Sequence, residues 1–419
     1  MSATSSSQAA KLLPQEDVRI ATAPLPVERH EVVVVGGGTA GITVAARLRR
    51  ALHSVNLAIV EPAERHYYQP LWTLVGGGVF DKSASERTEA SLIPEGAAWV
   101  REAAVELRPE ENLVVTGSGR QLGYDALVVA PGIQIDWDAI PGLRAALGES
   151  VGSIWSYEHL ERTWELIRDF QGGTAVFTYP VTPIKCPGAA QKIMYLADDT
   201  FRRAGIRGRT RVVYASAAPS IYSVPRYAPS LERVVERRGI ETLFRHNLVA
   251  IRPESREAVL EQLDTGEQVV LRYDLLHVAP PQSAPDLVKQ GPLAGPDGWL
   301  ELDKNTLQHA RFPNVFGLGD ASSLPTSKTG AAVRAQAKVL VANLVAALAG
   351  EELPARYDGY TACPIITGYG RLILAEFDYD LQPRETFPFD QSKERRSMYL
   401  LKKRVLPRFY WSLMLRGRG

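Results

Sequence analysis

Residues 31–61 read EVVVVGGGTAGITVAARLRRALHSVNLAIVE, and this stretch predicts the fold of the first part of the chain. A run of valines typical of a buried strand leads into Gly36, Gly38 and Gly41, which have the spacing G-x-G-x-x-G before a helical stretch. The first glycine permits a tight turn, the second lets the backbone approach a pyrophosphate, and the third allows close helix–strand packing. Glu61 ends the next strand, where a carboxylate can accept hydrogen bonds from ribose hydroxyls. The stretch therefore predicts a dinucleotide-binding unit.

A second series of strand, turn, helix and strand occupies residues 173–216. Alternating strands and helices predict a mostly parallel sheet with helices on its faces. The similar phrases YDALVVAPG (124–132) and YDLLHVAPP (273–281) follow the two series at corresponding places, which indicates an internal duplication. We therefore predict an α/β fold with two Rossmann-like domains.

The composition excludes several classes of protein. The 48 basic and 47 acidic side chains give a net charge of +1, so no chain-wide basic footprint for nucleic acid is present. Two cysteines exclude a disulfide-stapled scaffold and a four-cysteine metal site, and the histidines show no metal-binding spacing, so we predict no metal. No apolar run in the sequence approaches the length of about 20 residues that spans a bilayer.

The segment NVFGLGD (314–320) indicates which dinucleotide binds. It ends in Gly319 and Asp320, as in flavoproteins with two dinucleotide-binding domains, where this aspartate contacts the ribityl chain and phosphate of FAD. The long helix predicted after it directs its positive end at the flavin, and Lys328 adds a cation there. A helix cap is the alternative role of Asp320. We predict FAD as the cofactor.

The second series departs from the dinucleotide pattern at its turn. PVTPIKCPGAAQKIMYL (180–196) has a single glycine, so it offers no close approach to a nicotinamide pyrophosphate. Cys186 lies between Lys185 and a predicted helix start, and both features stabilise a thiolate. Burial as a small apolar side chain is the alternative. Sequence spacing does not place Cys363 beside Cys186, but an adjacent pair would form a redox-active disulfide.

From about Val32 to its end the chain closely resembles sulfide:quinone oxidoreductases of the mitochondrial, two-cysteine type. The resemblance rests on long strings: GGGTAGIT, VEPAERHYYQPLWTLVG, PVTPIKCPGAAQKIMYLADD, FGLGDASSLPTSKTGAA, YTACPIITGYGRLILAEFDYD and TFPFDQSKERRSMYL. Some members of the wider family carry a third cysteine. Its absence here implies that FAD is bound without a covalent link through cysteine.

The resemblance implies a reaction. Sulfide attacks a Cys186–Cys363 bridge of two or more sulfurs and leaves a persulfide on Cys363. The freed Cys186 thiolate passes two electrons to FAD, which a quinone (ubiquinone or menaquinone) reoxidises. The persulfide sulfur leaves to glutathione, sulfite, cyanide or more sulfide. It also implies FAD contacts beyond the glycine loop, at Thr39, Ala40, Gln69, Ala104 and Gly132, although Pro131 departs from the usual triplet before Gly132.

The end of the chain is basic and aromatic. From Lys393 onward Lys and Arg far outnumber the single acid, Glu394, and Pro407 predicts two short helices. This composition fits an anchor lying in the membrane interface, with a helix packed on the body or a dimer contact as alternatives. We expect a peripheral protein of a bacterial inner membrane, with quinone near Tyr369 and Phe377.

These patterns predict four regions. They are a loose N-terminal tail (1–28), a discontinuous FAD-binding domain (29–150 and 281–350), a second Rossmann-like domain (151–280), and a C-terminal region with amphipathic, membrane-anchoring helices (351–419). Three other functions remain open: a type II NADH:quinone oxidoreductase, which the missing second glycine loop opposes, a sulfide dehydrogenase that reduces a cytochrome, and an FAD-binding protein without turnover.

Overall fold

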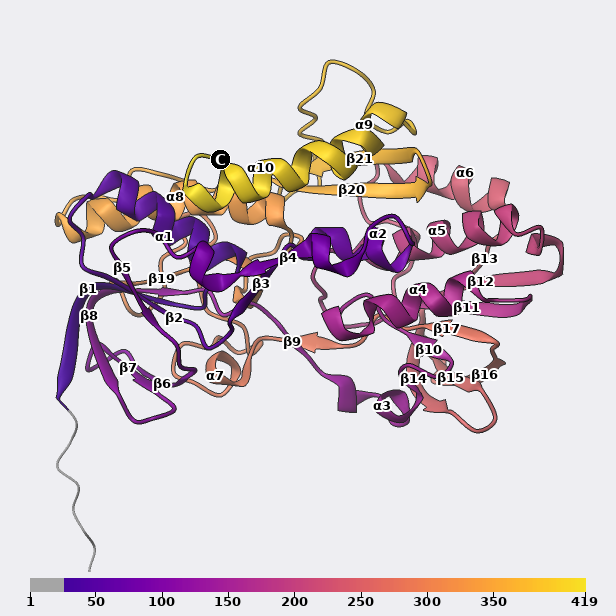
Figure 1. The fold of residues 1–419 in the computed structure, drawn as a ribbon, viewed down its shortest axis with the longest axis horizontal. Coiled ribbons are helices and arrows are strands. Elements are labelled where there is room, and N and C mark those ends of the chain that lie inside the picture. The colour runs from indigo at the N-terminus through magenta and orange to yellow at the C-terminus, as the bar shows by residue number, and fades with distance from the viewer. Residues whose placement is uncertain (1–25) are drawn as a thin grey trace, which may run out of the picture.

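The structure is a computed structural model that describes residues 26–419 (Figure 1). Most of the tail predicted for residues 1–28 lies outside the described residues, and strand β1 already begins at Val27. Two sheets lie side by side along the longest axis of the molecule, and the C-terminal helices run across their upper side. The predicted α/β architecture is confirmed.

The first sheet carries the glycine loop. Its parallel strands have the order β5-β2-β1-β8-β19, and β7 and β6 extend it as an antiparallel meander from the start of β8. The bounds are β1 (Val27–Val35), β2 (Leu57–Val60), β5 (Ala97–Val100), β6 (Ala104–Arg108), β7 (Leu113–Thr116), β8 (Gln121–Val129) and β19 (Val315–Gly317). The valines of β1 are buried because helices α1 (Thr39–Ala51) and α8 (Gly330–Leu348) pack above this sheet.

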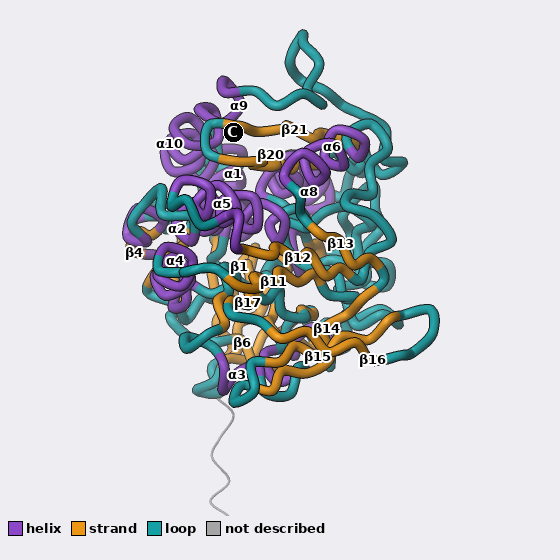
Figure 2. Tube along the Cα trace, turned by 90° about the vertical axis from the view of Figure 1, so that its right-hand side faces the viewer, coloured by secondary structure: helices purple, strands orange, loops and turns teal. Residues whose placement is uncertain are grey.

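The second sheet is wholly parallel, with its strands in the order β10-β17-β11-β12-β13. The bounds are β10 (Val151–Gly152), β17 (Leu275–His277), β11 (Gly173–Tyr179), β12 (Thr210–Ser216) and β13 (Glu241–Phe244). Alternate residues of β11 enter different cores: Phe177 packs with Ile193 of helix α5 (Ala189–Arg203), and Val176 packs with Leu248 of the antiparallel sheet below. That sheet contains β14 (His246–Arg252), β15 (Glu257–Gln262) and β16 (Gln268–Arg272), so helices and strands cover opposite faces (Figure 2).

An antiparallel hairpin joins the two halves. Strands β20 (Thr361–Gly368) and β21 (Arg371–Phe377) pair with each other, and β20 packs on both α5 and α8. Because β20 carries Cys363 and α5 starts three residues after Cys186, this packing sets the position of one cysteine relative to the other.

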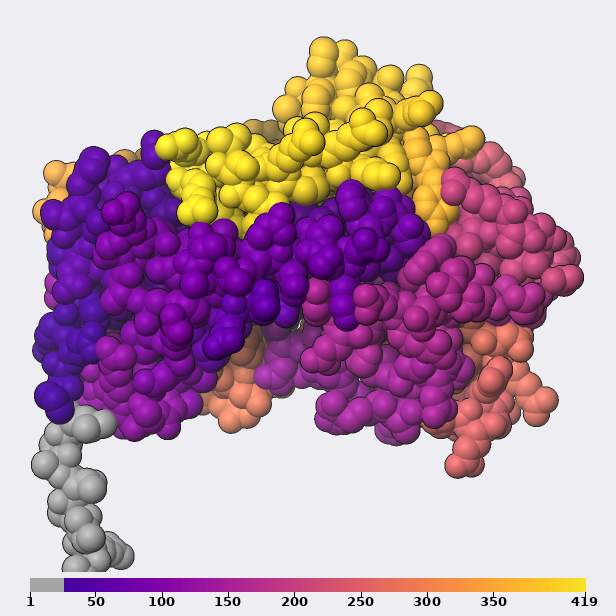
Figure 3. Space-filling model, in the orientation of Figure 1, coloured from indigo at the N-terminus to yellow at the C-terminus, as the bar shows by residue number. Residues whose placement is uncertain are grey.

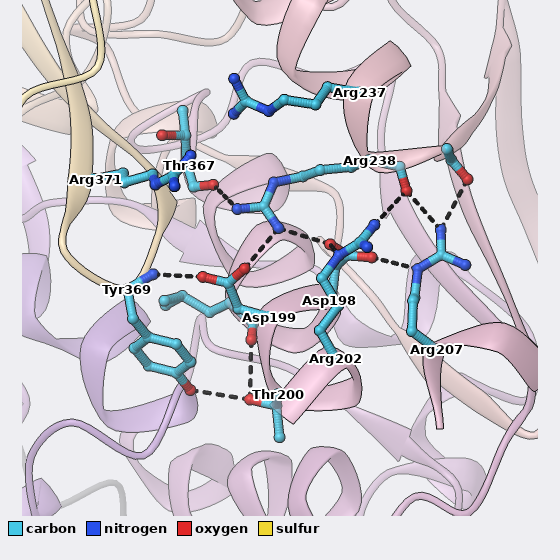
Figure 4. A network of polar contacts seen from close by, with 12 residues as sticks. Asp198, Asp199, Thr200, Arg202, Arg207, Arg237, Arg238, Thr367, Tyr369 and Arg371 are labelled. Atoms are coloured by element: carbon cyan, nitrogen blue, oxygen red, sulfur yellow. Dashed lines mark hydrogen bonds and ion pairs between the residues drawn. The ribbon is translucent and has the colours of Figure 1, made fainter. Parts of the chain in front are cut away.

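A buried ion-pair network holds the hairpin on α5 (Figure 4). Asp198 is fully buried and accepts hydrogen bonds from three guanidinium groups, those of Arg202, Arg207 and Arg238. Arg238, at the end of α6 (Ala228–Arg238), also donates to Asp199 at 2.7 Å and to the carbonyl of Thr367 in β20 at 2.5 Å. Removing one member of such a buried network costs about 3–5 kcal/mol of stability. The network therefore fixes α5, α6 and the hairpin as one unit.

The C-terminal helix continues through Pro407, so the prediction of two helices separated there is wrong. Helix α9 (Arg396–Leu400) leads into a π-helical turn (Leu401–Val405) and then α10 (Leu406–Ser412). In the π turn the N–H of Leu406 donates to the carbonyl of Leu401, five residues back. This wider turn removes the clash between a proline ring and the carbonyl four residues earlier that would break an α-helix.

The same helix lies flat on the body of the molecule, where its surface forms a continuous strip (Figure 3). Tyr410 is 3% exposed and Leu415 is fully buried, so neither faces outward as the sequence reading of an anchor required. The exposed apolar side chains are Leu400, Val405 and Leu413.

Among residues 26–419, only α8 is long and apolar enough to cross a membrane. Half of its apolar window is buried, against α1 and β20 among others. Burial in the protein core therefore explains the apolar composition of this helix.

Candidate active site

Four of the predicted cofactor residues lie at one edge of the first sheet. Gly36 follows β1, Glu61 follows β2, Gly132 follows β8 and Asp320 follows β19. These strands are parallel neighbours, so their carboxyl ends meet at the same edge. That edge is where open α/β sheets bind ligands.

The glycine loop leaves space for a phosphate group. Gly36 has φ +101°, and an added Cβ would lie 2.4 Å from the carbonyl oxygen of Ala130. A Cβ on Gly41 would lie 1.8 Å from the carbonyl oxygen of Gly36, which shows how closely α1 approaches the turn. At Gly38, by contrast, an added Cβ would meet no atom within 4 Å. The open position lies at the N-terminus of α1, which favours an anion.

Glu61 is hydrogen-bonded to the loop. The N–H of Gly37 donates to Glu61 Oε2 at 2.7 Å, and the N–H of Ala63 donates to Oε1 at 2.8 Å. Burial raises the pKa of Glu61 above its ordinary value, and the two backbone donors oppose this shift. A carboxylate so held beside the loop fits the ribose of a dinucleotide.

The remaining predicted contacts occupy different positions around this edge. Thr39 and Ala40 open α1, and Ala104 opens the edge strand β6. Gln69 begins a short 3₁₀ helix (Gln69–Leu71) and is exposed.

A buried cluster of charge surrounds Asp320. Burial raises the pKa of this carboxyl group, while the nearby ammonium groups of Lys328 and Lys185 lower it. Burial in turn lowers the pKa of each lysine to about 8. Lys328 Nζ donates to the carbonyl of Ser322 at 2.8 Å and lies 3.8 Å from the ring of Trp299. The two lysines place positive charge beside the predicted flavin edge.

The structure brings the two cysteines together, as free thiols. Cys186 has φ +51°, and its N–H donates to the carbonyl of Lys328 at 2.8 Å, which ties the cysteine turn to the first domain. Cys363 lies so close to the start of α5 that a Cβ added at Gly188 would be 2.6 Å from its Sγ. The two thiols lie close enough for each to shift the pKa of the other.

The two thiols differ in acidity. A hydrogen bond from Cys363 and the positive charges of Lys192 and Lys402 hold the pKa of Cys186 well below its ordinary value. The same hydrogen bond, together with burial, raises the pKa of Cys363. Cys186 is therefore the more acidic thiol of the pair.

The sequence analysis did not identify Lys192 and Lys402, the two lysines that lower the pKa of Cys186. Lys192, the fourth residue of α5, donates from Nζ to Cys186 Sγ at 3.1 Å. A charged residue inside the apolar run AAQKIMYLA was a signal that it had a specific partner. Lys402 comes from the π turn of the C-terminal helix, and no local pattern places it near residue 186.

His66, which the sequence left without a role, belongs to a buried chain of hydrogen bonds under the glycine loop. Its Nδ1 contacts Glu89 Oε2 at 3.1 Å and its Nε2 contacts the hydroxyl of Tyr410 at 2.6 Å. The same hydroxyl lies 2.7 Å from Thr39 Oγ1. The C-terminal helix thus contacts the first residue of α1.

The residues predicted to bind quinone do not lie together. Tyr369 occupies the turn of the hairpin and donates to the carbonyl of Gly77 at 2.6 Å. Phe377 is the last residue of β21, at the opposite end, and packs edge-on against Tyr222. A strand of this length separates them by about 20 Å, so they do not line one ring-sized site.

Comparison with known proteins identifies the family. Residues 30–170 match the pyridine nucleotide-disulphide oxidoreductase family. The chain is 48% identical to the mitochondrial sulfide:quinone oxidoreductase of Mus musculus, over 93% of this chain and 87% of the mouse protein. It is 46% identical to the corresponding protein of Dictyostelium discoideum, over 93% and 86%. The chain belongs to the sulfide:quinone oxidoreductase family. The resemblance read from the sequence strings is therefore confirmed.

A solved sulfide:quinone oxidoreductase, from Aquifex aeolicus, has the same fold. It matches 94% of this chain and 92% of its own with a TM-score of 0.79, at 20% identity. The expectation of a bacterial inner-membrane protein is contradicted, because the mouse and Dictyostelium members of the sulfide:quinone oxidoreductase family are mitochondrial proteins. Within residues 26–419, no group of three potential ligand side chains could hold a metal ion.

Proposed function

We propose that this chain oxidises hydrogen sulfide through Cys186 and Cys363, and passes two electrons by way of FAD to a quinone. The observation that carries the proposal is the pairing of the only two cysteines at the edge that also holds the glycine loop and Asp320. The pKa of Cys186 is lowered and that of Cys363 is raised, so the two thiols differ in acidity. Such a pair is suited to thiol–disulfide chemistry.

The residues at the sheet edge would hold FAD without a covalent bond. Gly38 at the open position would hold the pyrophosphate, Glu61 would accept hydrogen bonds from the ribose hydroxyls, and Asp320 would hold the ribityl chain. Lys185 and Lys328 provide the positive charge that favours a reduced, anionic ring. When bound, FAD supplies a two-electron acceptor that a quinone can reoxidise.

The acidities of the cysteines set the direction of the first step. In the oxidised enzyme, hydrosulfide attacks Cys363 Sγ, a new S–S bond forms there, and the Cys186–Cys363 bond breaks. The low pKa of Cys186 makes it the better leaving group, and Lys192 receives the emerging thiolate. The products are a Cys363 persulfide and a Cys186 thiolate.

The second step removes the sulfane sulfur. A small nucleophile such as glutathione, sulfite, cyanide or a further sulfide attacks the outer sulfur atom and leaves Cys363 as a thiolate. The two thiolates then lose two electrons, which FAD would accept when bound, and the disulfide is restored. Burial of Cys363 limits access to small nucleophiles for the first attack.

The quinone reaches the protein from a membrane, and the C-terminal helix supplies the docking surface. Its outer face presents Leu400, Val405 and Leu413, with Arg404 and Arg408 between them. Apolar side chains enter the lipid and arginines contact anionic headgroups. We therefore place the membrane against this face rather than around the aromatic residues predicted from sequence.

Anaerobic titration tests the function. Sulfide should bleach the flavin absorbance of the purified holoprotein, and added quinone should restore it. Cys186→Ser and Cys363→Ser should each abolish bleaching by sulfide while retaining FAD. Bleaching of the wild-type flavin by NADH but not by sulfide would instead favour a type II NADH:quinone oxidoreductase.

A further inference from the structure

Two lysines are buried beside the cysteine pair without a carboxylate partner. Lys192 is 1% exposed and Lys402 is 5% exposed, and among the described residues neither forms an ion pair with Asp or Glu. Buried lysines are almost always paired, because an isolated charge is costly to remove from water. Their partner should therefore be another kind of anion.

The hydrogen bonds of the two ammonium groups leave donors free. Within residues 26–419, Lys192 Nζ donates to Cys186 Sγ, and Lys402 Nζ donates to the carbonyl of Pro70 at 3.2 Å. An ammonium group has three N–H donors. Lys192 contacts Cys186 Sγ directly and Lys402 acts electrostatically on both cysteines, so the two ammonium groups together place positive charge beside the sulfur atoms.

Counting charges indicates what fits. In the disulfide form that hydrosulfide attacks, the cysteine pair carries no charge, so no thiolate neutralises the two ammonium groups. Their positive charge suits a small anion. Burial and the repulsion from Lys192 lower the pKa of Lys402 to about 8, and a bound anion would reverse that shift.

The backbone around Lys402 supports a specific role. Lys402 lies in the π turn, and π turns recur at functional sites because they redirect a side chain from the regular helical positions. Here the helix keeps Lys403 and Arg404 toward the surface while Lys402 points into the body.

We propose that Lys192 and Lys402 form the binding site for hydrosulfide, with their ammonium groups supplying the positive charge beside the cysteine bridge. This assignment rests on the proposed sulfide oxidation and names the residues that recruit its substrate. It also makes the C-terminal helix part of the active site, since the same turn that contributes Lys402 carries exposed Val405 on its outer face.

The test is the variant Lys402→Met, with Lys403→Met as the matched control on the neighbouring, outward position. We expect the concentration of sulfide that half-saturates anaerobic flavin bleaching to rise about tenfold or more, as for the loss of a charged hydrogen bond. The limiting rate of bleaching should change little, and the control should behave as wild type. Unchanged half-saturation in Lys402→Met would overturn the assignment.

A second measurement uses thiocyanate as a small, unreactive monovalent anion. It should slow alkylation of Cys186 by iodoacetamide in the wild-type protein and lose this effect in Lys402→Met or, should that variant not fold, Lys402→Gln. Absence of protection in the wild type would overturn the anion site regardless of any variant. If sulfide failed to bleach wild-type flavin while thiocyanate still protected Cys186, the proposed function would fall and the anion site would stand.

Discussion

Cys186 is held in a left-handed backbone conformation that residues other than glycine rarely adopt. Such a position costs of order 1–3 kcal/mol and persists only where surrounding contacts enforce it. Here the hydrogen bond from its N–H to the carbonyl of Lys328 fixes the turn. The result is that Sγ lies within reach of both Lys192 and Cys363.

Lys192→Met should make Cys186 a weaker nucleophile. Losing the ammonium group raises the pKa of Cys186 toward its ordinary value, so that alkylation slows at pH values below that ordinary pKa. In the wild type the thiolate is lost only as pH falls through the lowered pKa, and in the variant this loss should begin at higher pH. The measurement is the rate of iodoacetamide labelling against pH, with Lys393→Met as an exposed-lysine control. An unmoved profile would contradict the role of Lys192.

Gly38→Ala should reduce FAD affinity without destabilising the apoprotein. Gly38 has φ −67°, which alanine adopts freely, and an added Cβ meets no protein atom within 4 Å, so only the cofactor space is affected. We expect the dissociation constant of FAD, measured by flavin fluorescence, to be about tenfold higher in the variant than in the wild type. The two apoproteins should have equal thermal midpoints. Gly208→Ala, also at an open position, is the control. Equal FAD affinity would place the pyrophosphate elsewhere.

At the scale of elements, the C-terminal helix has two functional faces. Its inner face contributes Lys402 beside the cysteines and Tyr410 beneath the glycine loop, and its outer face is apolar and basic. The π turn permits this division because it rotates the helix after Lys402 and accommodates Pro407. Composition alone indicated an amphipathic segment. It predicted that Tyr410 faces the membrane, whereas Tyr410 is buried against the body of the protein.

Tyr410→Phe should destabilise the protein and weaken FAD binding. The change removes one hydroxyl that serves both His66 and Thr39, leaving buried polar atoms without that partner, at a cost of about 1–3 kcal/mol. Denaturant unfolding of the apoprotein measures the first effect and flavin fluorescence the second. Tyr124→Phe is the control, because the buried hydroxyl of Tyr124 has no hydrogen-bond partner among the described residues. Equal losses in both variants would mean that the Tyr410 hydrogen bonds contribute nothing specific.

At the scale of the whole molecule, three parts of the chain meet to form the cysteine pair and its charged surroundings. Cys186 comes from the second domain, Cys363 from the hairpin, and Lys402 from the C-terminal helix. The ion-pair network of Asp198 and Arg238 holds the first two parts together. The C-terminal helix, whose outer face is proposed to bind the membrane, also contributes Lys402 to the surroundings of the cysteines.

Val405→Asp should weaken membrane binding. It places a negative charge on the outer face, opposes insertion into lipid and repels anionic headgroups, so affinity for anionic vesicles should fall about tenfold or more. Cosedimentation with such vesicles, at low and high salt, measures the change. Val105→Asp, at an equally exposed valine of β6, should bind as wild type. If both variants bound equally, the membrane would contact another face.

Local sequence determined the α/β fold and the edge of the sheet that is predicted to bind the cofactor. The valine run, the glycine spacing and Glu61 encode a strand, a turn and a helix through neighbouring residues, so the α/β fold and the cofactor edge were predictable. The lysine and helix start next to Cys186 predicted a lowered pKa for this thiol, but the groups that lower it are Cys363, Lys192 and Lys402. Only the tertiary structure decided that Cys363, Lys192 and Lys402 surround that thiolate, that His66 and Tyr410 support the glycine loop, and which side of the last helix faces outward. Those contacts join residues far apart in sequence, and they depend on how complete elements pack rather than on any short-range pattern.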